Sequence, residues 1–416
     1  MDWSFSQIDW NAVDEALTEA LLGAFSVLGE LVSEQSTLGM EASVQLVVAR
    51  ELERLGFVVE QHAIDSEALR DDPASGLPSL SYEGRSILIG RRSGASRRSL
   101  LIQGHIDVVP AGEERLWSAP PFSAIERDGW LQGRGAADMK GGIAMAFAAI
   151  EALSVAAPFA LAGELSFASV IEEECGGNGA LAALLAGAVA DGVLIPEPTD
   201  LNLLLGGVGV LWCEVVVTRR SAHAAHPTTG GSALDGVLAV ADALRELVLG
   251  FEREDESTRD PDERYHMNVG TLAAGEWISC MPARATLGAR IGFPTAITPA
   301  EASQRVLAAV HAVDPLAEVH FTGFRAEGYR LDNEDPFAVA IAHCHRELHG
   351  ETPTPHSGPA TNDARFYARR GISAVCFGPR GRNLHGVDEA VEIASLATGA
   401  RTLTRLIPHW LHGESP

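Results

Sequence analysis

Apolar residues recur along this chain in two patterns, one with helical spacing and one of short runs bounded by polar or glycine residues. The helical spacing predicts helices over Asp9 to Val32, Glu41 to Leu55, Gly141 to Leu153, Ala180 to Ala190, Ala233 to Leu249, Pro299 to Val313, Pro336 to Leu348 and Ala390 to Leu411. The short runs predict strands over 57–64, 86–90, 100–104, 164–170, 192–195, 211–218, 266–275, 285–293 and 372–378. The segment from Asp65 to Ser81 is rich in Asp, Pro, Ser and Gly, which predicts a surface loop.

The order of these elements predicts an α/β fold with two domains. Strands and helices alternate through the first half, which is typical of a mixed, largely parallel sheet. The pattern changes near Gly206 and returns after Phe324. We therefore expect one domain built from residues 1–209 and 325–416, with a smaller, open-faced α/β sandwich inserted at residues 210–324. A length of 416 residues is consistent with two cores.

Chemically active residues follow several predicted strands. His105 and Asp107 come directly after the strand at 100–104, Asp138 follows a glycine-rich turn, and Glu197 follows the strand at 192–195. Because ligands bind beyond the carboxyl ends of parallel strands, these side chains could converge on one edge of the sheet. Residues two apart in a strand share a face, so His105 and Asp107 suit a metal ligand and its orienting carboxylate. The alternative for this pair is a polar strand end in a loop-rich region.

The acidic run Glu172-Glu173-Glu174 ends an apolar strand and precedes a Gly pair, where a solvated acidic face would be oddly placed. Together with His105, Asp138, Glu197 and the late His385, this run provides two imidazoles and several carboxylates. Such a set suits two borderline metal ions, most simply zinc. One carboxylate would have to bridge the two ions, and one glutamate would have to remain free as a base.

Composition and charge narrow the class of partner. The formal net charge of -25 argues against nucleic acid and anionic membranes, which select basic surfaces. The five cysteines form no C-x-x-C pair, which is typical of reduced thiols. The acidic N-terminus lacks the pattern of a signal peptide, and we identify no apolar run long enough to span a bilayer. These features predict a cytoplasmic location.

Several sequence blocks occur in an order that resembles a known family. They are GHIDVVP, W-x-x-PPF, DGWLQGRGAADMKGG, EEECGGNGA, PEPT, AHAAHP, NDARFY and LHGVDE. Over nearly the whole chain, these blocks resemble those of the M20 metallopeptidases, which include acetylornithine deacetylase, succinyl-diaminopimelate desuccinylase, aminoacylase and the glutamate carboxypeptidases. The resemblance implies a catalytic domain with a zinc-peptidase fold, an inserted lid and dimerisation domain, and two divalent metal ions per chain. Zn²⁺ is the expected ion, with Co²⁺ or Mn²⁺ as alternatives.

The resemblance also implies a role for each matching residue. His105 and Glu197 would share one metal, His385 and Glu174 the other, and Asp138 would bridge them. Asp107 would orient His105, Glu173 would be the general base, and the Asp138-Met139 peptide bond would be cis. Glu172 stands where the family has an aspartate, and the following C-G-G-N-G run fixes this register.

In the inserted domain, His223 matches a histidine that reaches the active site of a partner subunit and stabilises the oxyanion, which implies a homodimer. Arg290 and Arg365 match positions near the substrate carboxylate, and Arg365 lies in a block similar to that of the desuccinylases. Ser279 replaces a family asparagine. Asn268 is a further candidate for substrate binding, although it cannot be assumed to take over the role of that asparagine. We expect His226 to be structural.

The expected activity is hydrolysis of the amide bond of an N-acyl amino acid or similar small amide, by a deacylase of the acetylornithine deacetylase and desuccinylase group. A carboxypeptidase or dipeptidase on the same scaffold is the nearest alternative, and a metal-dependent aminohydrolase is a more distant one. A non-enzymatic scaffold with a relic site is disfavoured because every ligand and the base are present. We expect His343, His345 and His349, on one predicted helix, to be plain surface histidines.

Overall fold

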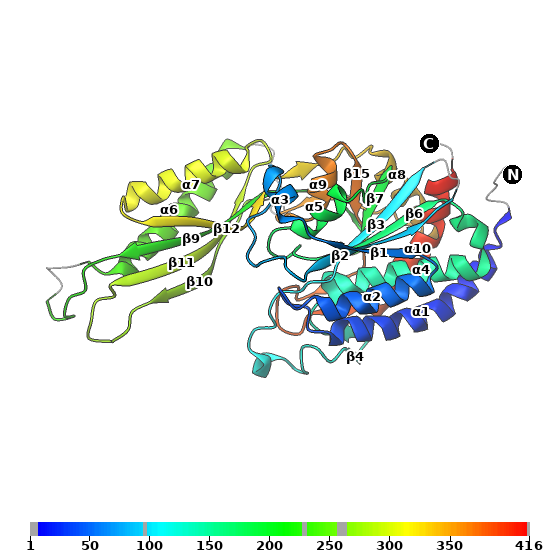
Figure 1. The fold of residues 1–416 in the computed structure, drawn as a ribbon, viewed down its shortest axis with the longest axis horizontal. Coiled ribbons are helices and arrows are strands. Elements are labelled where there is room, and N and C mark those ends of the chain that lie inside the picture. The colour runs from blue at the N-terminus through cyan, green and yellow to red at the C-terminus, as the bar shows by residue number, and fades with distance from the viewer. Residues whose placement is uncertain (1–6, 95–97, 227–230, 256–263, 414–416) are drawn as a thin grey trace.

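The computed structural model describes residues 7–94, 98–226, 231–255 and 264–413. Figure 1 shows an elongated molecule with two units. In the larger unit helices lie on both sides of an extended sheet, and in the smaller unit α6 and α7 lie beside a second sheet. Each unit has its own cluster of buried apolar side chains, and the cluster of the smaller unit is drawn from Val208 to Ala326. The domain boundaries at residues 210 and 324 remain a prediction.

The larger unit is built on a nine-stranded sheet with the order β1-β2-β6-β3-β7-β15-β8-β13, in which β14 pairs with β8. The strands are β1 Val58–Ala63, β2 Ser86–Arg92, β3 Ser99–His105, β6 Glu164–Val170, β7 Gly192–Ile195, β8 Leu203–Gly207, β13 Tyr329–Arg330, β14 Pro355–Gly358 and β15 Ser373–Cys376. The four central strands, from β6 to β15, are parallel. The pairs β2-β6, β15-β8 and β8-β13 are antiparallel, and β14 is parallel to β8. The prediction of an α/β fold with a mixed, largely parallel sheet is confirmed.

Helices cover both faces of this sheet (Figure 1). They are α1 Trp10–Ser33, α2 Ala42–Arg54, α4 Gly141–Ala156, α5 Asn178–Leu185, α8 Pro336–His349, α9 Ala364–Ala368 and α10 Ile393–His412. The predicted surface loop after β1 is partly wrong, because it begins with a short helix, α3 Ser66–Asp71. The Asp65 carboxylate caps that helix by accepting hydrogen bonds from the backbone N–H groups of Glu67 and Ala68.

Two sequence-based expectations about these helices need correction. First, the sequence predicts no apolar run long enough to span a bilayer. By length and composition, however, α1 and the segment Ala136–Ala156 are long and apolar enough to cross a membrane. A core helix of a water-soluble fold passes the same test, and 78% of the Ala136–Ala156 window is buried. Second, His345 is not a surface residue. Its side chain is buried and its Nδ1 lies 3.0 Å from the hydroxyl of Thr402 on α10.

A small antiparallel sheet brings two distant segments of the chain together. Its strands are β4 Ile125–Arg127, β5 Trp130–Gln132, β16 Gly381–Arg382 and β17 Ala390–Glu392, in the order β16-β17-β5-β4. A buried ion pair between Arg134 and Glu389 strengthens this join. Glu389 also accepts hydrogen bonds from the backbone N–H groups of Ala137 and Asp138, each at 3.1 Å. The glycine-rich turn before Asp138 is thereby fixed to the segment that carries His385.

The smaller unit is an antiparallel sheet with helices on one face. Its strands are β9 Gly209–Thr218, β10 Met267–Ala274, β11 Arg284–Phe293 and β12 Glu318–Ala326, in the order β10-β11-β9-β12. The helices α6 Ala233–Glu254 and α7 Pro299–Val313 pack against the apolar face, where β9 buries Leu211, Cys213 and Val215. The opposite face of the sheet is left open, and its end nearest the larger unit borders the candidate site.

Candidate metal centre and substrate cleft

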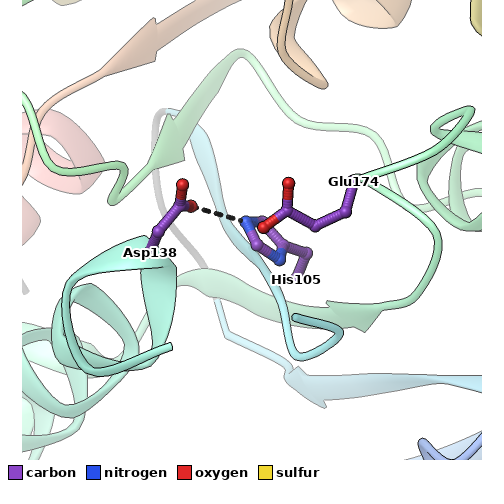
Figure 2. Close-up of side chains that lie close together, drawn as sticks. All are labelled: His105, Asp138 and Glu174. Atoms are coloured by element: carbon purple, nitrogen blue, oxygen red, sulfur yellow. Dashed lines mark hydrogen bonds and ion pairs between the residues drawn. The ribbon is translucent and has the colours of Figure 1, made fainter. Parts of the chain in front are cut away.

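His105 lies at the carboxyl end of β3, where the large sheet delivers it to the centre of the candidate site. Its imidazole is buried, and its Nε2 lies 3.1 Å from Oδ1 of Asp138. Its other ring nitrogen, Nδ1, lies 3.0 Å from the backbone carbonyl oxygen of Asp107 and 3.7 Å from Oδ1 of the same residue. Asp107 therefore fixes the ring, and Figure 2 shows the imidazole directed toward Asp138.

Asp138 lies between two histidines that are far apart in the sequence. Its Oδ1 faces His105, and its Oδ2 lies 3.3 Å from Nε2 of His385. Nε2 of His385 also lies 2.9 Å from Oε2 of Glu174, while Nε2 of His105 lies 3.8 Å from Oε1 of Glu197. The cluster thus divides into two groups of ligand atoms that share one carboxylate.

This division suits two cations held side by side. One carboxylate oxygen of Asp138 is directed toward each imidazole, which is the arrangement that a bridging ligand requires. Single ligand atoms from His105, Asp138 and Glu174 all lie within 4.8 Å of one another, close enough for the two groups to be adjacent (Figure 2). Imidazole and carboxylate ligands in this combination favour zinc and similar divalent ions.

The electrostatics of the cluster also favour cations. Burial raises the pKa values of Glu173 and Glu197 well above the ordinary glutamate value, and neighbouring carboxylates add to this effect. Burial acts in the same direction on Asp138, but its contacts with His105 and His385 outweigh it and hold the pKa of Asp138 below the ordinary value. Several carboxylates crowded into a buried site repel one another, so positive charge placed among them relieves the repulsion.

The backbone around the acidic run is held by Asp107. Its Oδ1 accepts a hydrogen bond from the N–H of Glu173 at 3.3 Å, and its Oδ2 accepts one from the N–H of Glu174 at 3.2 Å. The side chain of Glu172 turns the other way. It accepts hydrogen bonds of 2.6 Å from both Tyr82 and Arg85. Glu173 and Glu174 consequently face the site, and Glu172 does not.

A cleft of about 650 Å³ opens above this cluster, between the two units. Its floor contains Asp138, Glu173, Glu174, Glu197 and His385. The smaller unit contributes Val210, Trp212, His266, Arg290 and Phe324, and the segment after α8 contributes residues from His356 to Asn362. The floor carries the candidate metal ligands, so a substrate in this cleft would be enclosed by both units.

The remaining predicted residues lie at different distances from the cleft. Arg290 lines it and donates a 3.0 Å hydrogen bond to the carbonyl of Pro359. Asn268 is opposite Arg290 in the β10–β11 register but is not among the lining residues. Arg365 is buried outside the cleft, where it donates to the carbonyls of Gly176 at 2.7 Å and Asn362 at 2.9 Å. Their roles in substrate binding stay predictions.

His223 is an exposed residue on the connection that follows β9, and it does not line the cleft of its own chain. It pairs with Cys280, in the connection between β10 and β11, and its Nδ1 accepts a hydrogen bond from the N–H of Ala225 at 3.1 Å. Ser279 lies in the same pairing and accepts a hydrogen bond from the N–H of Ala224. This placement leaves His223 available to a second chain, and its role in stabilising the oxyanion stays a prediction.

Sequence reasoning did not single out the aromatic residues of the cleft. Trp212, His266 and His356 line it together with Phe324. Only the alternation along β9 offered a signal, since it separates Trp212 from the buried Leu211 and Cys213. The peptide bond between Asp138 and Met139 is cis, as the resemblance implied.

Comparison with known proteins finds similarity over most of the chain. The model of peptidase family M20/M25/M40 matches residues 101–409. A succinyl-diaminopimelate desuccinylase from Maricaulis maris is 29% identical over 409 residues, which cover 94% of this chain and 96% of that protein. An N-formyl-4-amino-5-aminomethyl-2-methylpyrimidine deformylase from Halalkalibacterium halodurans is 28% identical, with 76% and 80% coverage. The solved structure of the dipeptidase Dug1p from Saccharomyces cerevisiae shares the fold, with a TM-score of 0.77 at 14% identity over 97% of this chain and 98% of that one.

Proposed function

Because this chain belongs to peptidase family M20/M25/M40, and is thus a metal-dependent amide hydrolase, we propose that it removes the acyl group from an N-acyl amino acid. The observation that carries the proposal is the Asp138 carboxylate, which directs one oxygen toward His105 and the other toward His385. This arrangement supports a pair of cations at the floor of a cleft large enough for a small amide.

The residues present fit two divalent cations, which we propose are Zn²⁺. His105 and Glu197 would hold one ion, His385 and Glu174 the other, and Asp138 would contact both. When bound, the ions would supply the chemistry of lowering the pKa of a water molecule and polarising the amide carbonyl. Asp107 would keep the imidazole of His105 in the ligand orientation.

The proton transfers fall to Glu173. Its carboxyl group lies at the floor of the cleft beside the candidate metal ligands, where a carboxylate can accept a proton and then return it. Glu173 takes the proton from the attacking water and passes it to the nitrogen of the leaving amine. Arg290 binds the carboxylate of the substrate, and His223 of a second copy of the chain stabilises the oxyanion. The active enzyme would then be a homodimer formed through the smaller unit.

The choice of deacylase over peptidase rests on the relatives that align over most of this chain, which are named for the removal of succinyl and formyl groups. The dipeptidase with a similar fold keeps dipeptide hydrolysis as the second candidate. The five cysteines form no disulfide bonds, which supports a cytoplasmic location.

A substrate panel tests the proposed function. N-formyl, N-acetyl and N-succinyl amino acids and dipeptides are incubated with the zinc-loaded protein, and released amine is measured. We expect release from the acylated amino acids, and no release from any amide would refute the proposal. Glu173→Ala should abolish turnover while retaining two metal ions per chain, whereas Glu126→Ala, at an exposed carboxylate, should leave turnover unchanged.

A further inference from the structure

The open face of the smaller sheet forms one wall of the cleft. Val210 and Trp212 are two residues apart on β9, so their side chains lie on the same face of the sheet, and both line the cleft. Trp212 is directly opposite Arg290 on β11, and Arg290 is directly opposite Asn268 on β10. Side chains opposite one another in an antiparallel sheet begin about 5 Å apart, so the indole and the guanidinium are immediate neighbours.

Several aromatic rings line the cleft. The rings of Trp212 and Phe324 meet edge to face, with centroids 5.1 Å apart and an interplanar angle of 70°. His266, just before β10, and His356, on β14 of the larger unit, also line the cleft. None of these four side chains belongs to the two groups of metal ligands. The rings therefore line a part of the cleft that the candidate metal ligands do not.

The same wall carries the positive charge of the cleft. Among the described lining residues, Arg290 is the one lysine or arginine, whereas the floor carries four carboxylates. One nitrogen of Arg290 donates to the carbonyl of Pro359, in the segment after α8, and this bond fixes the guanidinium between the two units. Because a guanidinium has five N–H groups, this bond leaves others that can bind a carboxylate.

We propose that Trp212 and Arg290 together select N-acyl derivatives of aromatic amino acids. In such a substrate, two carbon atoms separate the ring from the carboxylate, which suits two neighbouring side chains about 5 Å apart. The ring packs on Trp212, the carboxylate binds Arg290, and the amide reaches the floor of the cleft. This inference rests on the proposed function and adds the identity of the amine part of the substrate.

The first experiment compares three acetylated amines with the zinc-loaded enzyme. N-acetylphenylalanine contains the ring and the carboxylate, N-acetylleucine lacks the ring, and N-acetylbenzylamine lacks the carboxylate. We expect the highest kcat/KM for N-acetylphenylalanine, by about threefold to tenfold over N-acetylleucine, which is the range that an aromatic contact supplies. Equal or lower kcat/KM for N-acetylphenylalanine would overturn the inference while leaving the proposed function intact. Hydrolysis of no amide at all would instead refute the proposed function.

Variants test which residue supplies the preference. Trp212→Leu should remove most of the preference for phenylalanine over leucine through a higher KM, and Trp212→Phe should restore it. Trp10→Leu replaces a tryptophan of α1 outside the cleft and should leave the preference unchanged. Arg290→Met should raise the KM of both amino-acid substrates but not that of N-acetylbenzylamine. An equal loss on all three substrates in Trp212→Leu would contradict a role in specificity.

Discussion

Glu172 lies next to the proposed base and second-metal ligand but takes no part in the cluster. Its carboxylate is buried between Tyr82 and Arg85, and Arg85 also pairs with the buried Glu41. The Glu172 backbone has a φ of 66°, and its carbonyl accepts a hydrogen bond of 3.0 Å from the N–H of Gly176. The ion network therefore fixes the turn that presents Glu173 and Glu174.

Replacement of Arg85 by Met tests the importance of this network. The variant leaves two buried carboxylates without their cation, so we expect the free energy of unfolding to fall by about 3 kcal/mol. Urea unfolding followed by circular dichroism measures the change. Arg115→Met removes an exposed pair with Glu113 and should cost less than about 1 kcal/mol. Equal free energies of unfolding for the two variants would show that the buried network stabilises the fold no more than an exposed ion pair does.

At the scale of whole elements, helices α8 and α10 meet around a histidine. The His345 ring packs against α10 through Thr402, and its ring centroid lies 4.6 Å from that of His349. Burial lowers the pKa of His345 to about 4, and the neighbouring His349 contributes in the same direction. The folded chain therefore keeps His345 neutral where the unfolded chain protonates it.

This difference predicts a pH dependence of stability. Between pH 6.5 and pH 4 the unfolded state binds a proton at His345 that the folded state does not, so stability falls as the pH is lowered through this range. His345→Gln keeps a polar partner for Thr402 but does not titrate. It should lose less stability than the parent on going from pH 7 to pH 5, by on the order of 2 kcal/mol. Urea midpoints at the two pH values measure this, and parallel losses would contradict it.

Elements with strong local patterns could be predicted from the sequence, and those that depend on distant partners could not. The helix at Pro299–Val313 and the strands at Glu164–Val170 and Gly192–Ile195 have the predicted limits. The two-residue strands β13 and β16 were missed, because so short a segment becomes a strand only through its partner. The candidate metal ligands follow strand ends and Gly-rich turns, whereas the position of Trp212 beside Arg290 depends on strand register, which no local pattern encodes.

For the molecule as a whole, the proposed metal ions would connect parts of the chain that are far apart. His105, Glu174 and His385 lie on three separate segments around Asp138. Ions bound only by the folded chain stabilise it, by about 2.7 kcal/mol for each ion at a free concentration 100 times its Kd. Without them, the repulsion among the buried carboxylates is not relieved.

Removal of metal should therefore destabilise the protein. We expect dialysis against a chelator to lower the melting temperature by several degrees, and stoichiometric Zn²⁺ to restore it. Differential scanning calorimetry with metal analysis of each sample provides the measurement. Asp138→Asn should show a smaller response to zinc than the parent. A melting temperature that is the same with and without metal would argue against the binuclear site.

The strand β15 has a consequence for how the protein is made. It occupies Ser373–Cys376 yet pairs with β7 on one side and β8 on the other, and His385 follows it. A nascent chain that has emerged only as far as Arg370 therefore lacks a central strand of its largest sheet and one proposed metal ligand. Domains generally fold as units during synthesis, so the larger unit cannot complete its sheet until the segment that contains β15 has been made. Premature termination before this point would yield a polypeptide without β15 and His385, and we expect such a polypeptide to have no hydrolytic activity.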